Sequence, residues 1–424
     1  MPHDSMILSR FPQLGEHSVV PPALAPFRGI DDAQRELTAR CSAGNASALD
    51  FAMLGNVMVR RGRYVDALEA YRVASDLDPS AALAHWACAE IAHVLDDVQT
   101  SREYRARALA LQRVYPDPLP VGNRTPILVL LRDAPYSVNA PLELVLDRSR
   151  LAIHKYYVEG DANPGLPDFA LAFCAFGAAE GARDATRRAA VFLAGTGRAL
   201  NDPVRLEGTA RESLERTLGG IDGVVAPGAT IATRAQVQSI ALPALVRPID
   251  THAGDGFAYL AEAQELNRHL LRFPAERYYI SQFLDYRSSD GLYRKFRVIF
   301  VDGVAYPYHL AIAAHWMVHY QSSPMGESRA LRDEERRFLE APERLVPSWD
   351  RVMPEIARAV GLDYFGIDAT VLPDGRLAVF EADAAMLVHD EGARDVFAYK
   401  RPFVTHIREA LHAAIASRTH RETR

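Results

Sequence analysis

The segment from Tyr364 to Asp383 constrains the fold of this chain more than any other part of the sequence. Two apolar stretches flank the turn sequence Pro-Asp-Gly-Arg at 373–376, which predicts a β-hairpin. Because side chains two positions apart in a strand share a face, we expect Asp368, Glu381 and Asp383 to converge on one side. Carboxylate oxygens of this kind suit Mg²⁺, which is usually shared with substrate phosphates. The hairpin therefore predicts a nucleotide–Mg²⁺ site.

A hairpin with a solvated acidic face is the alternative interpretation of the same residues, since acids in strands commonly mark the exposed side. The segment 380–385 favours the metal site. There Glu381 and Asp383 interrupt an otherwise apolar run. Such an arrangement costs free energy unless the carboxylates are paired or bound to metal.

The spacing of these acids resembles the ATP-grasp superfamily, whose metal site is an Asp or Glu followed about thirteen residues later by Glu-x-Asn. Glu381 follows Asp368 by 13 positions, and Asp383 follows Glu381 by 2. The sequence departs from the family pattern at Asp383, where Asn is usual. The departure adds a negative charge to the implied metal site.

Length, charge and cysteine content limit the classes of protein to consider. A chain of 424 residues is long enough for two or three domains. Its net charge of −6 and pI of about 6.2 argue against nucleic acid or an anionic membrane as partner. Three scattered cysteines and the lack of any long apolar run predict a soluble, cytoplasmic protein without metal-binding cysteines. The only lysines are Lys155, Lys295 and Lys400.

The first part of the chain divides into a Pro-rich arm, residues 1–30, and a helical region, residues 31–115. The helical region resembles tetratricopeptide repeats, and an ordinary helical bundle is the alternative. Such repeats would recruit a peptide or protein partner in their groove, or form a homodimer. The resemblance rests on aromatic, Leu-Gly, small and Pro positions at repeat spacing: Phe51, Leu54, Gly55, Met58, Gly62, Ala67, Tyr71, Ala74 and Pro79.

Beyond a Pro-rich linker at 115–120, strand patterns at 126–131, 151–158 and 169–174 alternate with helix or turn sequence. This alternation predicts an α/β domain with a mostly parallel sheet, residues 122–203. It resembles the domain that precedes the nucleotide-binding part of ATP-grasp ligases. The remaining residues, 204–424, correspond to the α+β ATP-grasp region. The predicted fold is thus multidomain: helical repeats, a pre-ATP-grasp α/β domain, and α+β ATP-grasp domains.

Residues 242–257 contain an apolar strand that ends in Arg247 and continues into a loop with Gly254 and Gly256. Glycines allow backbone N–H groups to approach phosphates, and a cation at the strand end neutralises their charge. In the family, a Lys usually stands at the place of Arg247, and the loop, here with His252, folds over the triphosphate. The resemblance also places Arg211, at the start of a helix expected from Gly208, near the phosphates.

Two further segments complete the implied site. The strand 278–285 corresponds to the one whose backbone binds adenine in the family, which implicates Gln282, Phe283 and Leu284. The hairpin 290–304 carries Lys295 and Arg297 on one face. The resemblance to glutathione synthetase and ribosomal-protein glutamate ligases gives Arg297 a catalytic role beside the transferred phosphate.

The three histidines and the aromatic residues of segment 308–320 could form substrate contacts or a proton relay, since His titrates near neutral pH, and a structural role is the alternative for each histidine. His309 is the catalytic candidate because it lies at the strand end nearest the proposed site. The spacing of the three histidines is not that of a compact zinc site. His389 is a further candidate.

The function implied by the resemblance is an ATP-dependent carboxylate–amine ligase that proceeds through an acyl phosphate and uses Mg²⁺, with Mn²⁺ as an alternative ion. Such chemistry needs positioning and charge neutralisation rather than a protein nucleophile. Two alternatives remain: a phosphotransferase on the same scaffold, and a non-catalytic nucleotide-binding adaptor. The carboxylate and the amine, whether small molecules or peptides, do not follow from the sequence.

Overall fold

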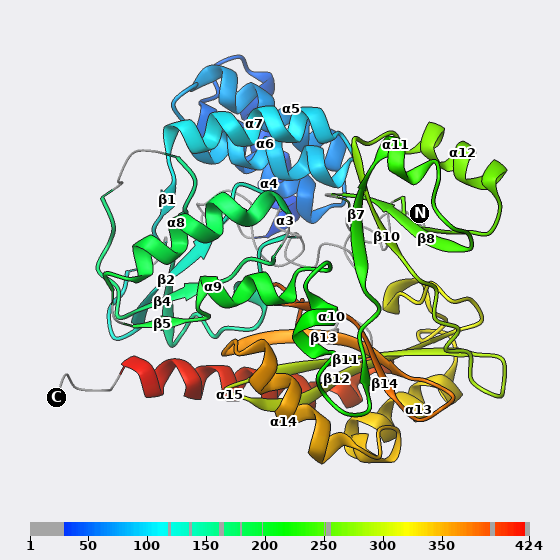
Figure 1. Ribbon diagram of the computed structural model, residues 1–424. Helices are drawn as coiled ribbons and strands as arrows, with labels where there is room; N and C mark the ends of the chain where they lie inside the picture. Colours follow the sequence, from blue (N-terminus) through cyan, green and yellow to red (C-terminus); the bar gives the residue numbers. More distant parts are fainter. Residues whose placement is uncertain are drawn as a thin grey trace. The chain divides into compact units, whose positions relative to one another are not determined.

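The computed structural model describes residues 29–117, 120–134, 138–160, 165–178, 180–196, 198–249, 251, 256–390 and 395–419. Figure 1 shows the chain as a ribbon. It divides into two compact units: residues 1–136 with 147–169, and residues 137–146 with 170–424. The expected arm therefore lies almost entirely outside the described residues. No helix among the described residues has both the length and the apolar character needed to cross a membrane.

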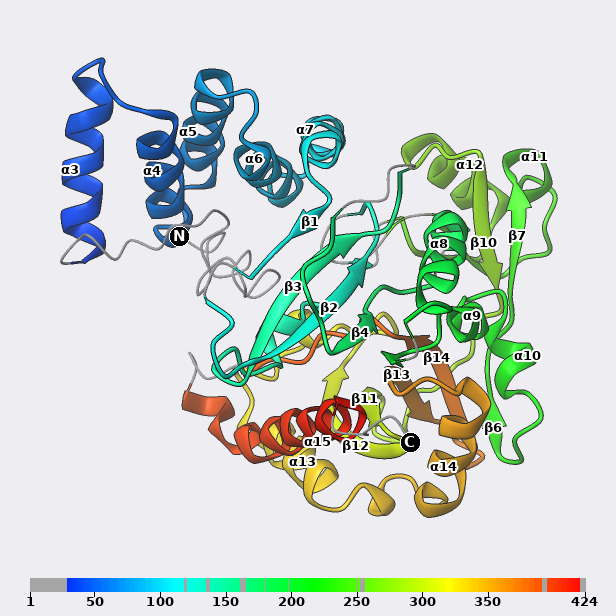
Figure 2. The same ribbon diagram turned by 90° about the vertical axis from the view of Figure 1, so that its left-hand side faces the viewer.

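The first unit begins with five helices, and consecutive helices pack against each other (Figure 2). A capping box starts the second, where the Ser47 hydroxyl accepts the N–H of Asp50 and the Asp50 carboxylate accepts the N–H of Ser47. The region is helical as expected, and its assignment to tetratricopeptide repeats stays a prediction. The helices are α3 (Ile30–Ser42), α4 (Ala48–Arg60), α5 (Tyr64–Leu77), α6 (Ala82–Val94) and α7 (Val98–Leu111).

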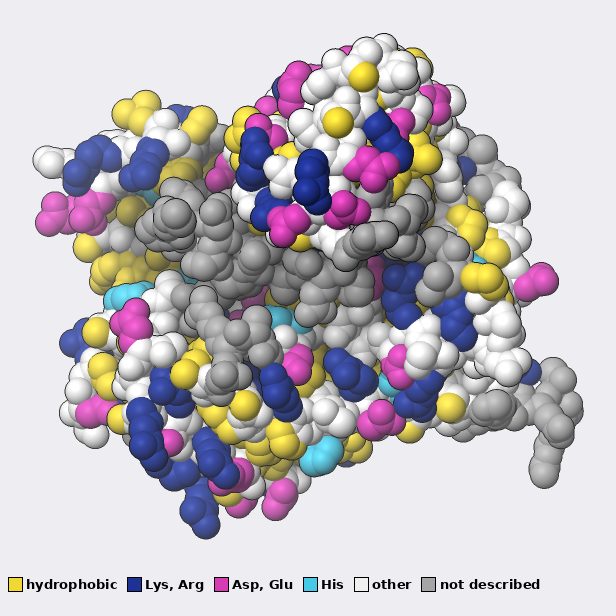
Figure 3. All heavy atoms as spheres, turned by 180° about the vertical axis from the view of Figure 1, so that it is seen from behind, with side chains coloured by type: hydrophobic (Ala, Val, Ile, Leu, Met, Phe, Trp, Pro, Cys, Tyr) yellow, Lys and Arg dark blue, Asp and Glu magenta, His cyan; other side chains and the backbone are white. Residues whose placement is uncertain are grey.

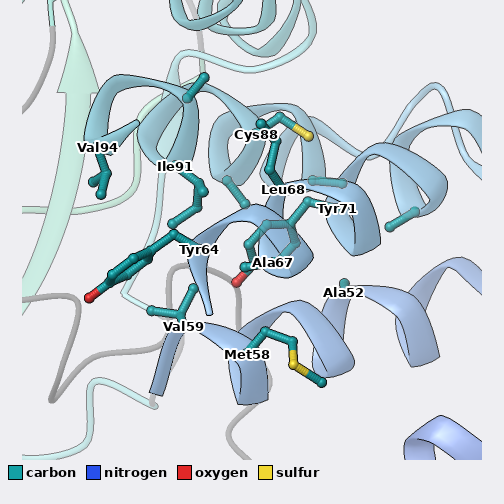
Figure 4. Close-up of a cluster of buried hydrophobic side chains, with 14 residues drawn as sticks. Ala52, Met58, Val59, Tyr64, Ala67, Leu68, Tyr71, Cys88, Ile91 and Val94 are labelled. Carbon is teal, nitrogen blue, oxygen red and sulfur yellow. The ribbon is translucent and has the colours of Figure 1, made fainter. Parts of the chain in front are cut away.

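The core of these helices forms where small residues let α4, α5 and α6 approach (Figure 4). A Cβ atom on Gly55 would lie 2.5 Å from the Tyr71 ring, so only glycine fits there. The Tyr71 hydroxyl in turn donates to Asn56 Oδ1 at 2.7 Å. Gly55 and Tyr71 thus meet across two neighbouring helices.

Three strands complete the first unit: β1 (Val114–Tyr115), β2 (Thr125–Leu131) and β3 (Leu151–Tyr157). The strands β2 and β3 are parallel, and β1 pairs antiparallel with β3. The predicted strands at 126–131 and 151–158 are therefore present. The strands β1, β2 and β3 belong to the same compact unit as the helices. The expected domain boundary between residues 115 and 122 stays a prediction.

The second unit starts with parallel strands β4 (Leu171–Cys174) and β5 (Ala199–Leu200), joined through α8 (Arg183–Leu193). The helix expected from Gly208 is shorter than predicted. After α9 (Pro203–Leu206) the chain turns at Ala210, whose ψ of 144° is extended, and α10 spans only Leu214–Leu218. The turn is held by the Thr217 hydroxyl, which donates to the Gly208 carbonyl at 2.8 Å. Arg211 therefore lies in a turn before the helix.

An antiparallel four-stranded sheet follows, with strand order β7-β10-β8-β9. Its own small core lies beneath α12, with Tyr278 fully buried. The elements are β7 (Ala229–Thr233), α11 (Arg234–Val237), β8 (Ala244–Pro248), β9 (Ala258–Leu260), α12 (Ala263–Arg272) and β10 (Arg277–Ser281).

The largest sheet of the second unit has the strand order β12-β11-β13-β14-β6. Three helices pack against its strands β11 and β12. The predicted hairpins at 290–304 and 364–383 are both present. The elements are β6 (Val224–Val225), β11 (Tyr293–Val301), β12 (Val304–Ala313), α13 (Arg329–Glu340), α14 (Trp349–Val360), β13 (Tyr364–Val371), β14 (Leu377–Asp383) and α15 (Arg401–Thr419).

Asn201 joins the end of β5 to β13 within the second unit. Its side chain is fully buried and satisfies both backbone groups of Tyr364, donating to the carbonyl and accepting from the N–H at 2.8 Å each. It has φ of 59°, a left-handed conformation that Asn adopts more readily than most residues. Asn201 therefore acts as an extra strand partner for the end of β13.

The described surface in Figure 3 intermixes Lys and Arg side chains with Asp and Glu side chains. This distribution matches the modest net charge of −6.

We expect Asn201→Ala to lower the free energy of unfolding by about 2–6 kcal/mol, because it leaves two buried backbone groups of Tyr364 without partners at roughly 1–3 kcal/mol each. Urea unfolding followed by tryptophan fluorescence would measure the loss. The exposed Asn267→Ala is the control. Equal stability of the two variants would contradict the role given to Asn201.

Candidate nucleotide and metal site

A cavity of about 180 Å³ lies between the four-stranded sheet and the largest sheet of the second unit. Predicted site residues from both sheets reach it, together with residues that the sequence did not single out. The predicted ones are Arg211, Arg247, Gln282, Phe283, Leu284, Lys295, Asp368 and Glu381. The others are Pro227, Ala229, Leu245, Phe257, Tyr279, Ser281, Tyr286, Trp316, Met317, Val318, His319 and Phe380.

One row of residues crosses the largest sheet beside this cavity. His309 on β12 pairs with Arg297 on β11, Arg297 pairs with Asp368 on β13, and Asp368 pairs with Glu381 on β14. Register shifts occur on both sides of the central pair, after Arg297 toward β12 and after Asp368 toward β14. Such β-bulges are frequent next to active sites, where they re-aim side chains.

The carboxylates of this row are each held by cations. Asp368 accepts from Lys295 Nζ at 2.9 Å and from Arg297 Nε and Nη2 at 2.7 and 3.1 Å. Glu381 accepts from Nη2 of Arg211. The predicted phosphate-side cations and metal-side acids are therefore brought together in one place.

Burial and charge act against each other on these groups. Burial alone would raise the pKa of Asp368, but Arg297 and Lys295 hold it well below its usual value. Burial likewise opposes ionisation of Glu381, but Arg211, Arg247 and Lys295 together outweigh it, so that the pKa of Glu381 is lowered. Both acids are thus carboxylates at neutral pH.

Asp383 lies on the same face as Glu381, opposite Gly366, but it does not join the other two acids. Its Oδ1 accepts the N–H of Ala385 at 2.9 Å, and its carboxylate lies against Gly177, where a Cβ would be 2.4 Å away. It is not among the residues that line the cavity. Among the described residues, no group of three Asp, Glu, His or Cys side chains could hold a metal ion.

Two carboxylates are nevertheless an appropriate donor set for Mg²⁺, which commonly takes one or two protein carboxylates and completes its shell with water and substrate phosphates. Asp368 and Glu381 supply hard oxygen atoms at paired positions on the cavity wall. The three cations that now bind these oxygens could bind phosphate oxygens equally well. The site therefore fits a metal that arrives with a nucleotide, and Asp383 as a third ligand stays a prediction.

The predicted phosphate loop is described only in part. Arg247, at the end of β8, is buried and lines the cavity, with its Nε donating to Thr251 Oγ1 at 3.0 Å. Gly256 has φ of 62° and packs against Pro248, where a Cβ would be 2.7 Å from the ring. His252 and Gly254 lie outside the described residues, and so their predicted role is untested.

An aromatic wall closes one end of the cavity. Trp316 meets Phe257 and Phe283 edge to face, with ring centroids 5.4 and 5.7 Å apart. Phe257 and Phe283 come from the segments expected to bind phosphate and adenine, whereas Trp316 comes from the loop after β12. A planar aromatic ring could stack there. Only the approach of the two sheets brings these side chains together, and sequence spacing carries no signal for that.

His309 and His319 occupy different places. His309 is buried, stacks on Tyr320 at 4.6 Å, and lies outside the cavity lining, next to Arg297. Burial and the charge of Arg297 hold its pKa well below the usual value, so the ring is neutral. His319 lines the cavity, and burial together with Lys295 lowers its pKa to about 4. The sequence favours His309 because of its position at the strand end. In the structure, His319 in the loop after β12 lines the cavity and His309 does not.

We expect Asp383→Asn to raise the melting temperature of the metal-free protein, and to do so more as pH rises from 4 to 7. Burial and Glu381 raise the pKa of Asp383 to about 7, whereas the pKa of the unfolded carboxyl stays near its ordinary value of 3.8. Unfolding between these pH values releases a proton, so the native acid costs stability as pH rises, and Asn removes that cost. Thermal denaturation in excess chelator measures the gain, with the exposed Asp222→Asn as control. A gain that falls with pH would contradict the environment described for Asp383.

No protein-family model and no curated protein sequence matches the chain. Solved structures similar to it include the D-Ala:D-Ser ligase from Enterococcus faecalis, at 12% identity and a TM-score of 0.42, covering 69% of this chain and 99% of that one. They also include a RimK-domain ATP-grasp protein from Sphaerobacter thermophilus, at 16% identity, TM-score 0.37, and 66% and 99% coverage. A third is D-alanyl-alanine synthetase A from Vibrio cholerae, at 8% identity, TM-score 0.44, and 70% and 99% coverage. At such scores the likeness carries no argument about activity. The structural neighbours of this chain are ATP-grasp ligases.

Proposed function

We propose that the protein is an ATP- and Mg²⁺-dependent ligase of the ATP-grasp type, which joins a carboxylate to an amine and releases ADP and phosphate. The observation that carries the proposal is the row Arg297–Asp368–Glu381 at a cavity between the four-stranded sheet and the largest sheet of the second unit. The row supplies metal-binding oxygens and phosphate-binding cations within a few ångströms. Such a combination suits phosphoryl transfer, which needs positioning and charge neutralisation more than covalent chemistry by the protein.

Different parts of the cavity would bind different parts of ATP–Mg²⁺. The aromatic wall around Trp316 would receive the adenine ring, and Arg247 and Arg211 would bind the phosphates that extend toward β13 and β14. Asp368 and Glu381 would hold Mg²⁺, which supplies charge neutralisation on the phosphate oxygens. Lys295 and Arg297, released from Asp368, would then stabilise charge on the transferred phosphoryl group.

The chemistry that follows is balanced without a protein nucleophile. A carboxylate oxygen of the first substrate attacks the γ-phosphorus, the bond to the β-phosphate oxygen breaks, and ADP leaves. The amine of the second substrate then attacks the acyl carbon, and phosphate leaves as the amide forms. The residues of the cavity orient these groups and exclude water.

We expect ADP release only when ATP, a divalent cation, a carboxylate and an amine are all present, and we expect Glu381→Gln to abolish it while the protein stays folded. Glu381 is one of the two carboxylates that would hold the metal. A coupled ADP assay over pairs of amino acids and peptides, with product mass, is the measurement, and the exposed Glu340→Gln is the control. Turnover of the wild type in excess chelator would overturn the proposal. A phosphorylated product without an amine would identify a phosphotransferase instead.

Arg247→Ala and Arg297→Ala should each lower kcat/KM. The expected loss of transition-state stabilisation is about 2–4 kcal/mol, the range for a lost electrostatic donor. Both cations lie where charge would develop during transfer, one on each sheet. Steady-state kinetics would test this against Arg336→Ala, whose side chain is 59% exposed. A variant with unchanged kcat/KM would remove that arginine from the site.

A further inference from the structure

The second unit contains a buried ion pair between Lys400 and Glu335, on the far side of β12 from the row of charged residues. Lys400 is 2% exposed and Glu335 is fully buried, with Nζ and Oε1 3.7 Å apart. Three aromatic rings surround the ammonium group, with centroids 4.0, 5.2 and 5.8 Å from Nζ in Tyr320, Tyr308 and Phe397. The lysine is thus held by one carboxylate and an aromatic cage.

A buried ion pair is a poor source of stability, because the cost of desolvating both charges offsets their attraction, and apolar residues of similar volume often serve as well. The role of the pair therefore follows from the groups that bind to it. Glu335 accepts from the backbone N–H of Leu310 at 3.1 Å, from the Tyr320 hydroxyl at 2.9 Å and from the Tyr399 hydroxyl. The carboxylate therefore ties together β12, the segment after it, and the segment before α15.

Tyr320 connects this cluster to the cavity. It directly follows the loop residues Trp316 to His319, which line the cavity. Its ring lies between Lys400 and His309 and is nearly parallel to the imidazole, at 11° and 4.6 Å. His309 in turn pairs with Arg297. The ion pair thus holds the C-terminal end of the loop and supports one end of the charged row.

We propose that Glu335 and Lys400 are positioning residues that set the loop 314–319 against the nucleotide cavity, acting through Tyr320. This inference rests on the proposed function, because it takes the cavity as the nucleotide site. Neither residue of the pair lines the cavity, and its contact with the segment that follows the loop is made through the ring and hydroxyl of Tyr320.

The test uses Lys400→Met, Glu335→Gln and Tyr320→Phe in the full chain, with two readouts. Calorimetry measures the affinity for ATP–Mg²⁺, and the fluorescence of Trp316, taken as the difference from the same protein carrying Trp316→Phe, reports the loop without nucleotide. Phe338→Leu is the matched control, since Phe338 is buried on the same helix, three residues from Glu335, and packs on Phe296 and Trp349 away from the loop.

We expect Lys400→Met and Glu335→Gln to weaken ATP–Mg²⁺ binding by about tenfold, equivalent to roughly 1.4 kcal/mol, and to shift the Trp316 emission to longer wavelength. Tyr320→Phe, which keeps the ring and loses only the hydroxyl, should show part of both effects. Phe338→Leu should lose stability and retain wild-type affinity and emission. This pattern separates positioning from a general loss of stability.

Wild-type affinity and an unshifted Trp316 spectrum in the three variants would overturn the inference, whatever their melting temperatures. If Lys400→Met and Glu335→Gln fail to fold, Tyr320→Phe alone tests the positioning role, because it leaves the ion pair in place. A wild-type protein that binds no ATP–Mg²⁺ would overturn the proposed function instead. In that case the Trp316 spectra without nucleotide still test whether the ion pair sets the loop.

Discussion

The candidate site depends on one ion pair, between Arg297 on β11 and Asp368 on β13. The two residues face each other across adjacent strands, so their contact is built into the register of the sheet. Asp368 is almost completely buried, and a lone carboxylate in such a place would take up a proton rather than remain charged. Arg297, with Lys295, keeps it ionised and therefore available to a metal. The same contact fixes the positions of the two cations beside the cavity.

Much of this arrangement could be predicted from the sequence, because the information is local. Alternation along 293–301 and 364–383 placed Lys295 and Arg297 on one face, and Asp368 and Glu381 on one face. The strands are adjacent in space, so two hairpin patterns were sufficient to bring the four side chains together. The specific contacts, with Asp368 shared between two cations, follow from the burial that only the structure shows.

The parts that could not be predicted depend on contacts between distant segments. Asp383 obeys the alternation, yet its carboxylate lies against Gly177, accepts the N–H of Ala385 and does not line the cavity. Trp316 and His319 line the cavity in the loop after β12, where Trp316 packs on Phe257 and Phe283, and no periodicity marks that loop. The helix expected from Gly208 begins only at Leu214, since a tertiary contact of Arg211 with Glu381 and a turn at Ala210 replace its first residues.

The bulge in the hairpin of β13 and β14 has a consequence for how this protein can vary in length. Ala369 pairs with Val379 and Asp368 with Glu381, so Phe380 is the extra residue. In a regular strand two successive side chains point to opposite faces, but here Phe380 and Glu381 both line the cavity. Residues gained or lost in the exposed turn at 373–376 leave that pairing intact. Loss of Phe380 itself would remove the bulge yet leave Glu381 opposite Asp368, so the pairing of the two carboxylates tolerates a one-residue deletion that the local bend of the strand does not.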